Sequence, residues 1–318
     1  MLEKSQPLNV IDFFNLIAQP HERACVTIGN FDGVHIGHQA IIRKMVKQAE
    51  GNGKTVIVIT FFPDPSDFFN PEREAFYLTS PGEKKDRLFA LGVDRVLTFH
   101  FTHEVSELTA REFLCGLKEK VGLKTLVIGR DFALGKNRQG TLPVIQSLEE
   151  VINFSLEMVE PIEFEGEEVS STRIRHLLAD GQVGEAKVLL DRPYSISGLV
   201  THGSDRGSKI GLPTANIAHW PKKQLPAIGV YATRVNLGEN EYLGITNVGL
   251  RPTFEDQKRP NIETHLLDFD GNIYGEELEL YFVQKIRDEK KFSGVDALLE
   301  QITRDKITAR KIFSHEPR

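Results

Sequence analysis

A glycine-rich stretch between an apolar run and a helical pattern carries two histidines, His35 and His38, three positions apart. Residues at this spacing share one face of a helix, so the two imidazoles can act on one ligand. Gly33 and Gly37 let the backbone approach a phosphate closely, and a helix N-terminus offers unpaired amides and a positive dipole end. The stretch predicts a site for nucleotide phosphates. The alternative is two unrelated surface or capping histidines.

Hydroxyl and guanidinium groups recur in a second segment, Ser170-Ser171-Thr172-Arg173-Ile174-Arg175. At a helix start, the hydroxyls of Ser171 and Thr172 can meet a phosphate, and Arg175 can add positive charge. By itself the segment would be an ordinary N-cap followed by an exposed helix.

A third candidate is the run from His202 to Asn216, which places three glycines and two cations before Pro213-Thr214-Ala215-Asn216. Such a loop can wrap phosphates. The Thr214 hydroxyl and the Asn216 amide oxygen are hard ligands that suit the Mg²⁺ carried by ATP. Without further support, the glycines are explained more simply by a hairpin loop.

The first stretch resembles the signature of the adenylyl-transferring nucleotidyltransferases. Its longer form, Gly29-Asn30-Phe31-Asp32-Gly33-Val34-His35-Ile36-Gly37-His38, is similar to that of the prokaryotic bifunctional riboflavin kinase/FAD synthetase family. Ser170 to Arg175 is similar to the second nucleotide motif of that family, and Val127 to Gly140 to the loop after its fourth strand. The resemblance implies that His35 and His38 are catalytic and that Asp131 contacts the flavin. It also implies that ATP phosphates are bound by Asn30, Gly37, Ser171, Thr172 and Arg175.

The resemblance extends to the riboflavin kinase half. It implies that Gly207 and Gly211 bind ATP phosphates and that Thr214 and Asn216 hold the nucleotide with Mg²⁺. Glu263 matches the catalytic glutamate, which accepts the proton of the ribityl 5′-hydroxyl. Arg287 begins a segment that resembles part of the flavin pocket. Without the resemblance, Glu263 would be an outward-facing charge on an edge strand.

Three residues depart from the family pattern. Asp64 stands between two prolines where a histidine is common, and an acid there would repel phosphate. Asp191 replaces a glycine before Arg-Pro-Tyr, and Ser208 replaces an arginine of the kinase loop.

The first half of the chain alternates β-type runs with helical patterns, which predicts a parallel sheet covered by helices. The expected strands are Cys25 to Gly29, Thr55 to Phe62, Asp94 to Phe101, Thr125 to Gly129 and Phe154 to Glu160. Two helix starts carry capping-box pairs, Ser80 with Glu83 and Thr109 with Glu112. The histidines would lie after the first strand, in the crevice where doubly wound sheets bind ligands.

After Asp191 the pattern becomes that of an antiparallel β-barrel. The expected strands are Ser195 to His202, Gly229 to Leu237, Tyr242 to Leu250, Ile262 to Phe269 and Glu277 to Ile286. Turn residues at 237–240 and 270–272 predict two hairpins. Ser293 to Phe313 has the spacing of an amphipathic helix that packs on the barrel.

The predicted fold is therefore an α/β, Rossmann-like nucleotidyltransferase domain followed by an antiparallel β-barrel riboflavin kinase domain with a terminal helix. We place the boundary between residues 1–187, the FMN adenylyltransferase domain, and residues 188–318, the riboflavin kinase domain.

Composition limits the class of protein. The 318 residues are 40% hydrophobic and 26% charged, as in globular proteins of about two domains. The longest nearly unbroken apolar run, Val56 to Phe62 with only Thr60 interrupting, is far shorter than the roughly 20 residues of a membrane helix. No secretory signal is visible, and the formal charge of -6 does not favour nucleic acid or anionic membranes. We expect a cytoplasmic protein; the oligomeric state stays open.

The expected function is phosphorylation of riboflavin to FMN, followed by transfer of an adenylyl group from ATP to FMN, which gives FAD and pyrophosphate. ATP with Mg²⁺ is the co-substrate, and the flavins are substrates and products. Two alternatives remain: only one of the two centres is active, or the chain is a regulator that binds flavin or nucleotide without turnover.

Overall fold

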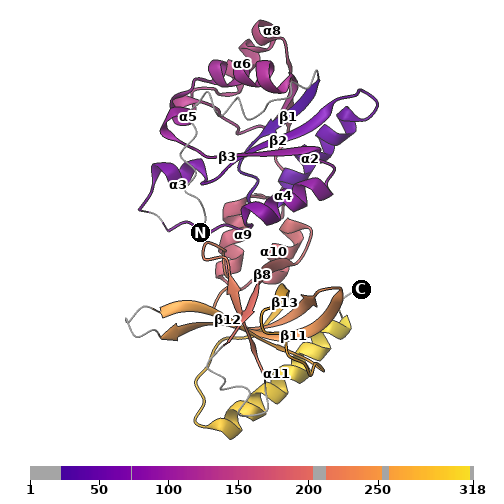
Figure 1. Ribbon diagram of the computed structural model, residues 1–318, viewed down its shortest axis with the longest axis vertical. Coiled ribbons are helices and arrows are strands. Elements are labelled where there is room, and N and C mark those ends of the chain that lie inside the picture. Colours follow the sequence, from indigo (N-terminus) through magenta and orange to yellow (C-terminus); the bar gives the residue numbers. More distant parts are fainter. Residues whose placement is uncertain (1–22, 73, 203–212, 253–257, 316–318) are drawn as a thin grey trace. The chain divides into compact units, whose positions relative to one another are not determined.

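The computed structural model describes residues 23–72, 74–202, 213–252 and 258–315 (Figure 1). The chain forms two compact units. The first comprises Met1–Ala75 and Thr79–Ser170, and the second comprises Phe76–Leu78 and Ser171–Arg318. Each unit is described below by itself.

The first unit contains a sheet of five parallel strands in the order β3-β2-β1-β4-β5. Their bounds are β1 Ala24–Ile28, β2 Thr55–Phe61, β3 Arg95–Phe99, β4 Leu123–Gly129 and β5 Ser155–Val159. All five predicted strands are confirmed to within two residues at each end. The order reverses between β1 and β4, which makes the loop after β1 the place where such a sheet binds ligands.

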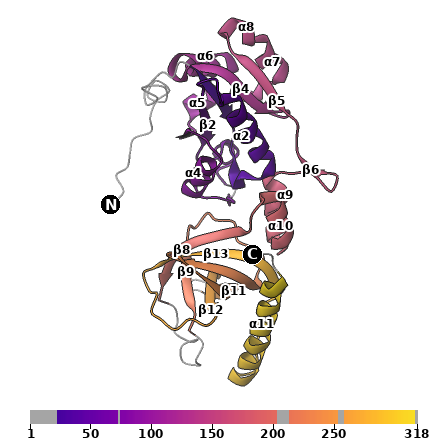
Figure 2. The ribbon, with the colours of Figure 1, turned by 90° about the vertical axis from the view of Figure 1, so that its right-hand side faces the viewer.

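Helices cover both faces of this sheet (Figures 1 and 2). One buried cluster includes Ile42 and Met45 of α2 and Leu88 of α4, and another includes Phe113 and Leu117 of α6. Both predicted capping boxes are present, at the starts of α4 and α6. The helices of this unit are α2 Ile36–Ala49, α3 Pro65–Phe69, α4 Pro81–Ala90, α5 His103–Glu107, α6 Ala110–Val121, α7 Leu142–Ser147 and α8 Glu149–Ile152, with 3-10 turns η1 Asp32–Val34 and η2 Lys136–Arg138. A small hairpin joins β6 Glu163–Phe164 to β7 Glu167–Glu168.

The second unit begins with α9 Ser171–Ala179 and α10 Val183–Leu190 and continues into a closed barrel of order β10-β11-β12-β9-β8-β13. The strands are β8 Tyr194–Thr201, β9 Ala215–His219, β10 Gly229–Leu237, β11 Asn240–Pro252, β12 Lys258–Leu266 and β13 Glu277–Arg287. The antiparallel barrel is confirmed. The strand prediction missed β9, because its first two residues, Ala215 and Asn216, belong to the run that we interpreted as a loop.

The first predicted hairpin is confirmed, since Leu237 pairs with Asn240 across a two-residue turn. The second is wrong. The segment after β12 leads to β13, but β12 pairs with β11 and β9, whereas β13 pairs with β10 and β8. The Asp-Gly-Asn turn at 270–272 therefore lies in a longer connection, because turn residues indicate a reversal without fixing which strands pair.

The terminal helix α11, Val295–His315, packs on the outside of the barrel as predicted. Its Ala309 is buried against Val230 of β10 and Ile245 of β11. Inside the barrel, the Thr246 hydroxyl hydrogen-bonds to those of Thr233 and Thr264, at 2.7 and 2.9 Å, so these buried hydroxyls are satisfied.

Asp191, one of the departures, ends α10 in the left-handed conformation with φ of 58°. Glycine adopts this conformation at little cost, and aspartate tolerates it better than most residues. The backbone thus accounts for the glycine common at this position and for its replacement here.

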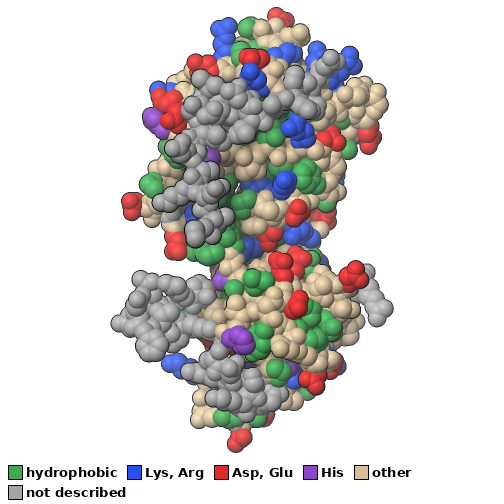
Figure 3. All heavy atoms as spheres, viewed as in Figure 1, with side chains coloured by type: hydrophobic (Ala, Val, Ile, Leu, Met, Phe, Trp, Pro, Cys, Tyr) green, Lys and Arg blue, Asp and Glu red, His purple; other side chains and the backbone are tan. Residues whose placement is uncertain are grey.

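Acidic and basic side chains are interspersed on the face of the molecule in Figure 3. Among the described helices, none is both long enough and apolar enough to cross a membrane.

Candidate active sites

The chain leaves β1 through a turn with three left-handed residues. Phe31, Gly33 and Val34 have φ angles of 50°, 79° and 44°. Only the glycine adopts this conformation without cost, so the surrounding structure must hold the other two. The Phe31 side chain is 2% exposed and anchors the turn in the core.

Thr79, 46 positions along the chain from Gly33, holds the turn from one side. Its hydroxyl accepts a hydrogen bond from the Gly33 amide at 3.1 Å. Its amide and hydroxyl both donate to Oδ1 of Asp32, at 3.0 and 3.2 Å. Asp32 and Thr79 are buried, so these bonds are shielded from water.

Lys84 holds the turn from α4. Its Nζ donates to the main-chain oxygen of Asn30 at 2.7 Å and to the Thr60 hydroxyl at 3.2 Å. The Thr60 hydroxyl donates to the same Asn30 oxygen at 3.0 Å. We did not predict a role for Lys84, because a lysine in an amphipathic helix is ordinarily exposed. Only the tertiary structure reveals that it is buried.

His35 and His38 are brought together as predicted. The His35 side chain caps α2 by accepting from the His38 amide at 3.4 Å, and the two rings stack at 3.7 Å. A Cβ on Gly37 would lie 3.2 Å from the His35 ring, which favours glycine between them.

The His38 side chain is half-buried. Burial lowers the pKa of His38 well below its ordinary 6.5, and the positive charges of His35 and Lys84 act in the same direction. Its Nδ1 is buried and makes no hydrogen bond. A neutral imidazole has one N–H donor and one acceptor nitrogen, so the ring can hydrogen-bond to a ligand that reaches its exposed part.

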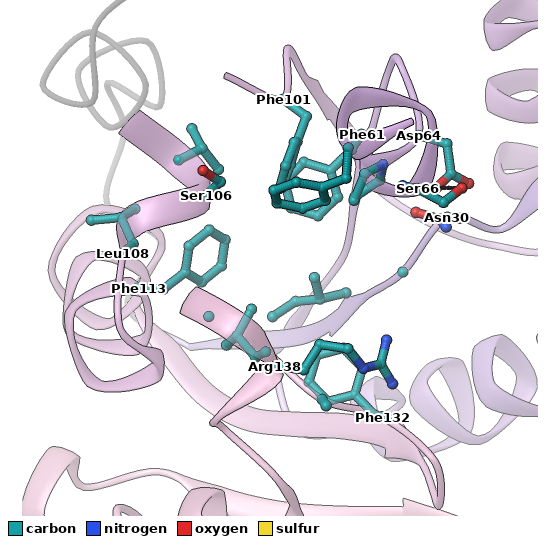
Figure 4. Close-up of a pocket in the computed structure, with 18 of the residues that line it drawn as sticks. Asn30, Phe61, Asp64, Ser66, Phe101, Ser106, Leu108, Phe113, Phe132 and Arg138 are labelled. Atoms are coloured by element: carbon teal, nitrogen blue, oxygen red, sulfur yellow. Dashed lines mark hydrogen bonds between the residues drawn. The ribbon is translucent and has the colours of Figure 1, made fainter. Parts of the chain in front are cut away.

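A cavity of about 780 Å³ opens beside this turn (Figure 4). Its polar side contains Asn30, Asp64 and Ser66, while Phe132 and Arg138 lie across from them. Its walls are rich in aromatic rings, from Phe61, Phe69, Phe101, Phe113 and Phe132. The predicted residues Asn30 and Asp131 both line it. A cavity of this composition suits a flat aromatic ligand with a polar end.

The Asp64 carboxylate forms hydrogen bonds within the cavity wall. Its Oδ1 caps α3 by accepting from the amide and the hydroxyl of Ser66, both at 2.9 Å. This departure therefore has a local structural role at the rim of the cavity.

Ser171, Thr172 and Arg175 lie on α9, in the second unit. Ser171 and Arg175 are one helical turn apart and share a face. Val169 of the first unit, two residues before α9 begins, has its carbonyl 3.7 Å from the position of a Cβ on Gly37.

In the barrel, three polar residues lie in a row across adjacent strands, and two of them are predicted site residues. Glu263 on β12 lies opposite Asn247 on β11 and Asn216 on β9. Residues directly opposite on antiparallel strands have Cβ atoms about 5 Å apart, so the three side chains are neighbours. The Glu263 carboxylate accepts from Nδ2 of Asn261 at 2.9 Å. Asn247 is not among the predicted site residues, and the register of β11 with β12 brings it opposite Glu263.

A cavity of about 320 Å³ lies between the outer face of the barrel and α11. Predicted residues Thr214, Glu263 and Arg287 line it, together with Leu298 and Ile302 of α11. The Thr214 hydroxyl and the Asn216 amide are oxygen donors beside the Glu263 carboxylate, a set that fits a Mg²⁺ ion held mainly by phosphates. Gly207, Gly211 and Ser208 lie outside the described residues.

Arg287 is held by Asp305 of α11. Its Nε and one terminal nitrogen donate to the Asp305 carboxylate at distances between 2.8 and 3.1 Å. Gln301 donates to the same carboxylate at 2.7 Å, and Asp305 is 2% exposed. An arginine held in this way is fixed in orientation. The helix α11 therefore both lines the cavity and positions Arg287 within it.

Comparisons with known proteins identify two families along the chain. A family model described as FAD synthetase matches residues 17–173, and one described as riboflavin kinase matches residues 190–313. The predicted boundary between residues 187 and 188 lies between these matches and stays a prediction.

Curated relatives span nearly the whole chain. The bifunctional riboflavin kinase/FMN adenylyltransferase of Escherichia coli (strain K12) is 37% identical over 301 residues, 94% of this chain and 96% of the relative. That of Bacillus subtilis (strain 168) is 34% identical over 305 residues, 95% and 96% of the two chains. A crystal structure described as a macrolide-efflux protein from Streptococcus pneumoniae superposes with a TM-score of 0.86 at 32% identity and covers 93% of this chain and 96% of that one. With both family models matched in order and relatives aligned end to end, the chain belongs to the bifunctional riboflavin kinase/FMN adenylyltransferase family.

Proposed function

We propose that this chain phosphorylates riboflavin to FMN in its second unit and adenylylates FMN to FAD in its first. The observation that carries the proposal is that each unit has its own cavity, lined by residues of the motif for the corresponding reaction. Glu263 can accept the proton of the ribityl hydroxyl. A regulator that only bound flavin would need no such proton acceptor.

For adenylyl transfer, a phosphate oxygen of FMN attacks the α-phosphorus of ATP, and pyrophosphate leaves. Phosphate is already a competent nucleophile, so the protein needs to position the reactants and stabilise negative charge. The neutral His38 donates to phosphate from a fixed ring, and His35 orients that ring through the stack. The aromatic cavity holds the flavin ring near Asn30 and Asp131.

Ser171, Thr172 and Arg175 contribute phosphate contacts, as their similarity to the second nucleotide motif implies. We assign Arg175 to the developing charge on the leaving pyrophosphate.

For riboflavin phosphorylation, Glu263 accepts the proton of the 5′-hydroxyl while that oxygen attacks the γ-phosphorus of ATP, and ADP leaves. Thr214 and Asn216 would hold Mg²⁺, which would neutralise phosphate charge. Gly207 and Gly211 wrap the phosphates, and Arg287 with α11 shapes the flavin pocket. The substrates and products are small molecules, and the proposed compartment is the cytoplasm.

The test is chromatographic separation of riboflavin, FMN and FAD after the purified chain is incubated with riboflavin, ATP and Mg²⁺. A parallel reaction starts from FMN. FMN followed by FAD supports both centres, whereas FMN alone would limit the activity to the kinase. No conversion of either flavin would favour a binding protein.

A further inference from the structure

The turn that carries His35 and His38 depends on residues outside its own motif. Phe31 and Val34 are non-glycine residues in the left-handed region, which costs free energy unless tertiary contacts compensate. On the α4 side those contacts come from Thr79, just before the helix, and from Lys84 in it. Of these two residues, Lys84 donates a hydrogen bond to the carbonyl of Asn30, the residue just before Phe31.

Burial makes Lys84 unusual for its position. Its side chain is 5% exposed, whereas its neighbour Lys85 on the same helix is exposed. Removal of an ammonium group from water is costly, so a buried lysine needs strong partners. Burial lowers the pKa of Lys84, and the carboxylates of Asp32 and Asp64 oppose that shift. An apolar side chain of similar length would fill the same space without this cost, which argues that the ammonium group has a function.

The hydrogen bond to Asn30 has geometric consequences. A peptide unit is planar, so a fixed carbonyl on Asn30 also fixes the direction of the Phe31 amide, where the left-handed part of the turn begins. The Phe31 ring lies 4.9 Å from the His38 ring, and His38 stacks on His35. A chain of contacts thus runs from the Lys84 ammonium to both imidazoles.

We propose that Lys84 is a positioning residue for adenylyl transfer: its buried ammonium group holds the Asn30 carbonyl and thereby fixes the turn that presents His35 and His38. This inference rests on the proposed function of the first unit. Lys84 acts through the turn, so its loss should alter the reaction step more than flavin binding in the aromatic cavity.

The test compares Lys84→Met, which keeps the length of the side chain up to Cε and removes the ammonium group, with Lys85→Met on the same helix. FAD formation from FMN and ATP is measured at varied FMN, and FMN formation from riboflavin serves as an internal control in the second unit. We expect Lys84→Met to lower kcat for FAD formation about 100-fold, with little change in the KM for FMN, because small misplacements have effects of that size. Lys85→Met should match the wild type in both reactions.

Lys84→Gln separates donation from charge, since its amide can still donate to the Asn30 oxygen. It should retain more FAD formation than Lys84→Met. Equal kcat values for folded Lys84→Met and wild type would overturn the inference, as would a change confined to the KM for FMN. If the wild-type chain itself makes no FAD, the proposed function fails, which is a different result.

If Lys84→Met does not fold, Thr60→Val provides the test, because it removes the second donor to the same carbonyl and keeps the side-chain shape. We expect it to lower kcat for FAD formation about tenfold, the equivalent of one hydrogen bond. The second unit's kinase activity should not change. A folded Thr60→Val chain with wild-type kcat would overturn the inference.

Discussion

The two units place their predicted catalytic residues on different kinds of structure. In the first, His35 and His38 follow a turn whose shape depends on Thr79 and Lys84 from elsewhere in the chain. In the second, Glu263 lies within a strand, and the register of the ladder alone brings it beside Asn216. A motif on a turn needs remote support, whereas a residue on a strand is positioned by backbone pairing.

The cavities differ in the same way. The larger one is walled by aromatic residues from several loops and helices of the first unit. The smaller one is a groove on the outside of the barrel that α11 completes through Leu298, Ile302 and the Asp305–Arg287 pair. Because each cavity is lined within its own unit, a change at one site should leave the other reaction intact.

Glu263→Gln should have the largest effect. Because the amide cannot accept the ribityl proton, FMN formation should fall by about 100- to 10,000-fold. Conversion of FMN to FAD should continue at the wild-type rate. Both reactions are followed by chromatography, with the exposed Glu277→Gln as the control. Loss of both activities in a folded Glu263→Gln chain would contradict the separation of the two sites.

His38→Ala should give the reverse pattern. Removal of one charge-stabilising donor should slow FAD formation about 100- to 1,000-fold and leave riboflavin phosphorylation intact. The exposed His315→Ala is the matched control. Undiminished FAD formation would exclude His38 from the adenylyl-transfer site.

Asp305→Ala tests whether α11 is essential to the second site. The change leaves a largely buried Arg287 without its carboxylate, and such a loss costs about 3–5 kcal/mol of the free energy of unfolding. Thermal unfolding should show the loss, and the KM for riboflavin should rise because the arginine is no longer held. The exposed Asp296→Ala on the same helix should have little effect. Wild-type stability and KM in this variant would show that the second site does not depend on the Asp305–Arg287 pair.

The smallest effect is a pH dependence of stability in the first unit. Burial keeps the pKa of His38 well below 6.5 in the folded chain, while in the unfolded chain the imidazole regains its ordinary 6.5. Below pH 6.5 the unfolded state therefore binds a proton that the folded state does not, and stability falls as the pH drops toward the folded pKa. The slope from this one group is at most about 1.4 kcal/mol per pH unit.

Denaturant unfolding at a series of pH values measures that slope. His38→Gln should flatten it in the window just below pH 6.5, whereas the exposed His100→Gln should not. Equal slopes for wild type and His38→Gln would show that His38 can be protonated in the folded state.

Much of this arrangement was predictable from the sequence, because local rules decide it. The alternation of apolar runs with capped helical patterns, such as Ser80 with Glu83, predicted the parallel sheet. The position of the glycine-rich stretch after the first strand predicted that its histidines lie at the switch point. The family resemblance supplied Glu263, Thr214 and Asn216 as candidates, whose catalytic and binding roles remain predictions.

Other features were decided only by the tertiary structure. Lys84 and Thr79 are ordinary residues in the sequence, and they hold the reactive turn because α4 packs against it. The second hairpin was predicted wrongly because turn residues are local, whereas closure of the barrel determines which strands pair. Asp305 could be recognised as the partner of Arg287 only once α11 lay on the barrel. Each of these contacts joins residues distant in sequence, and their proximity depends on the packing of whole elements, which no local pattern encodes.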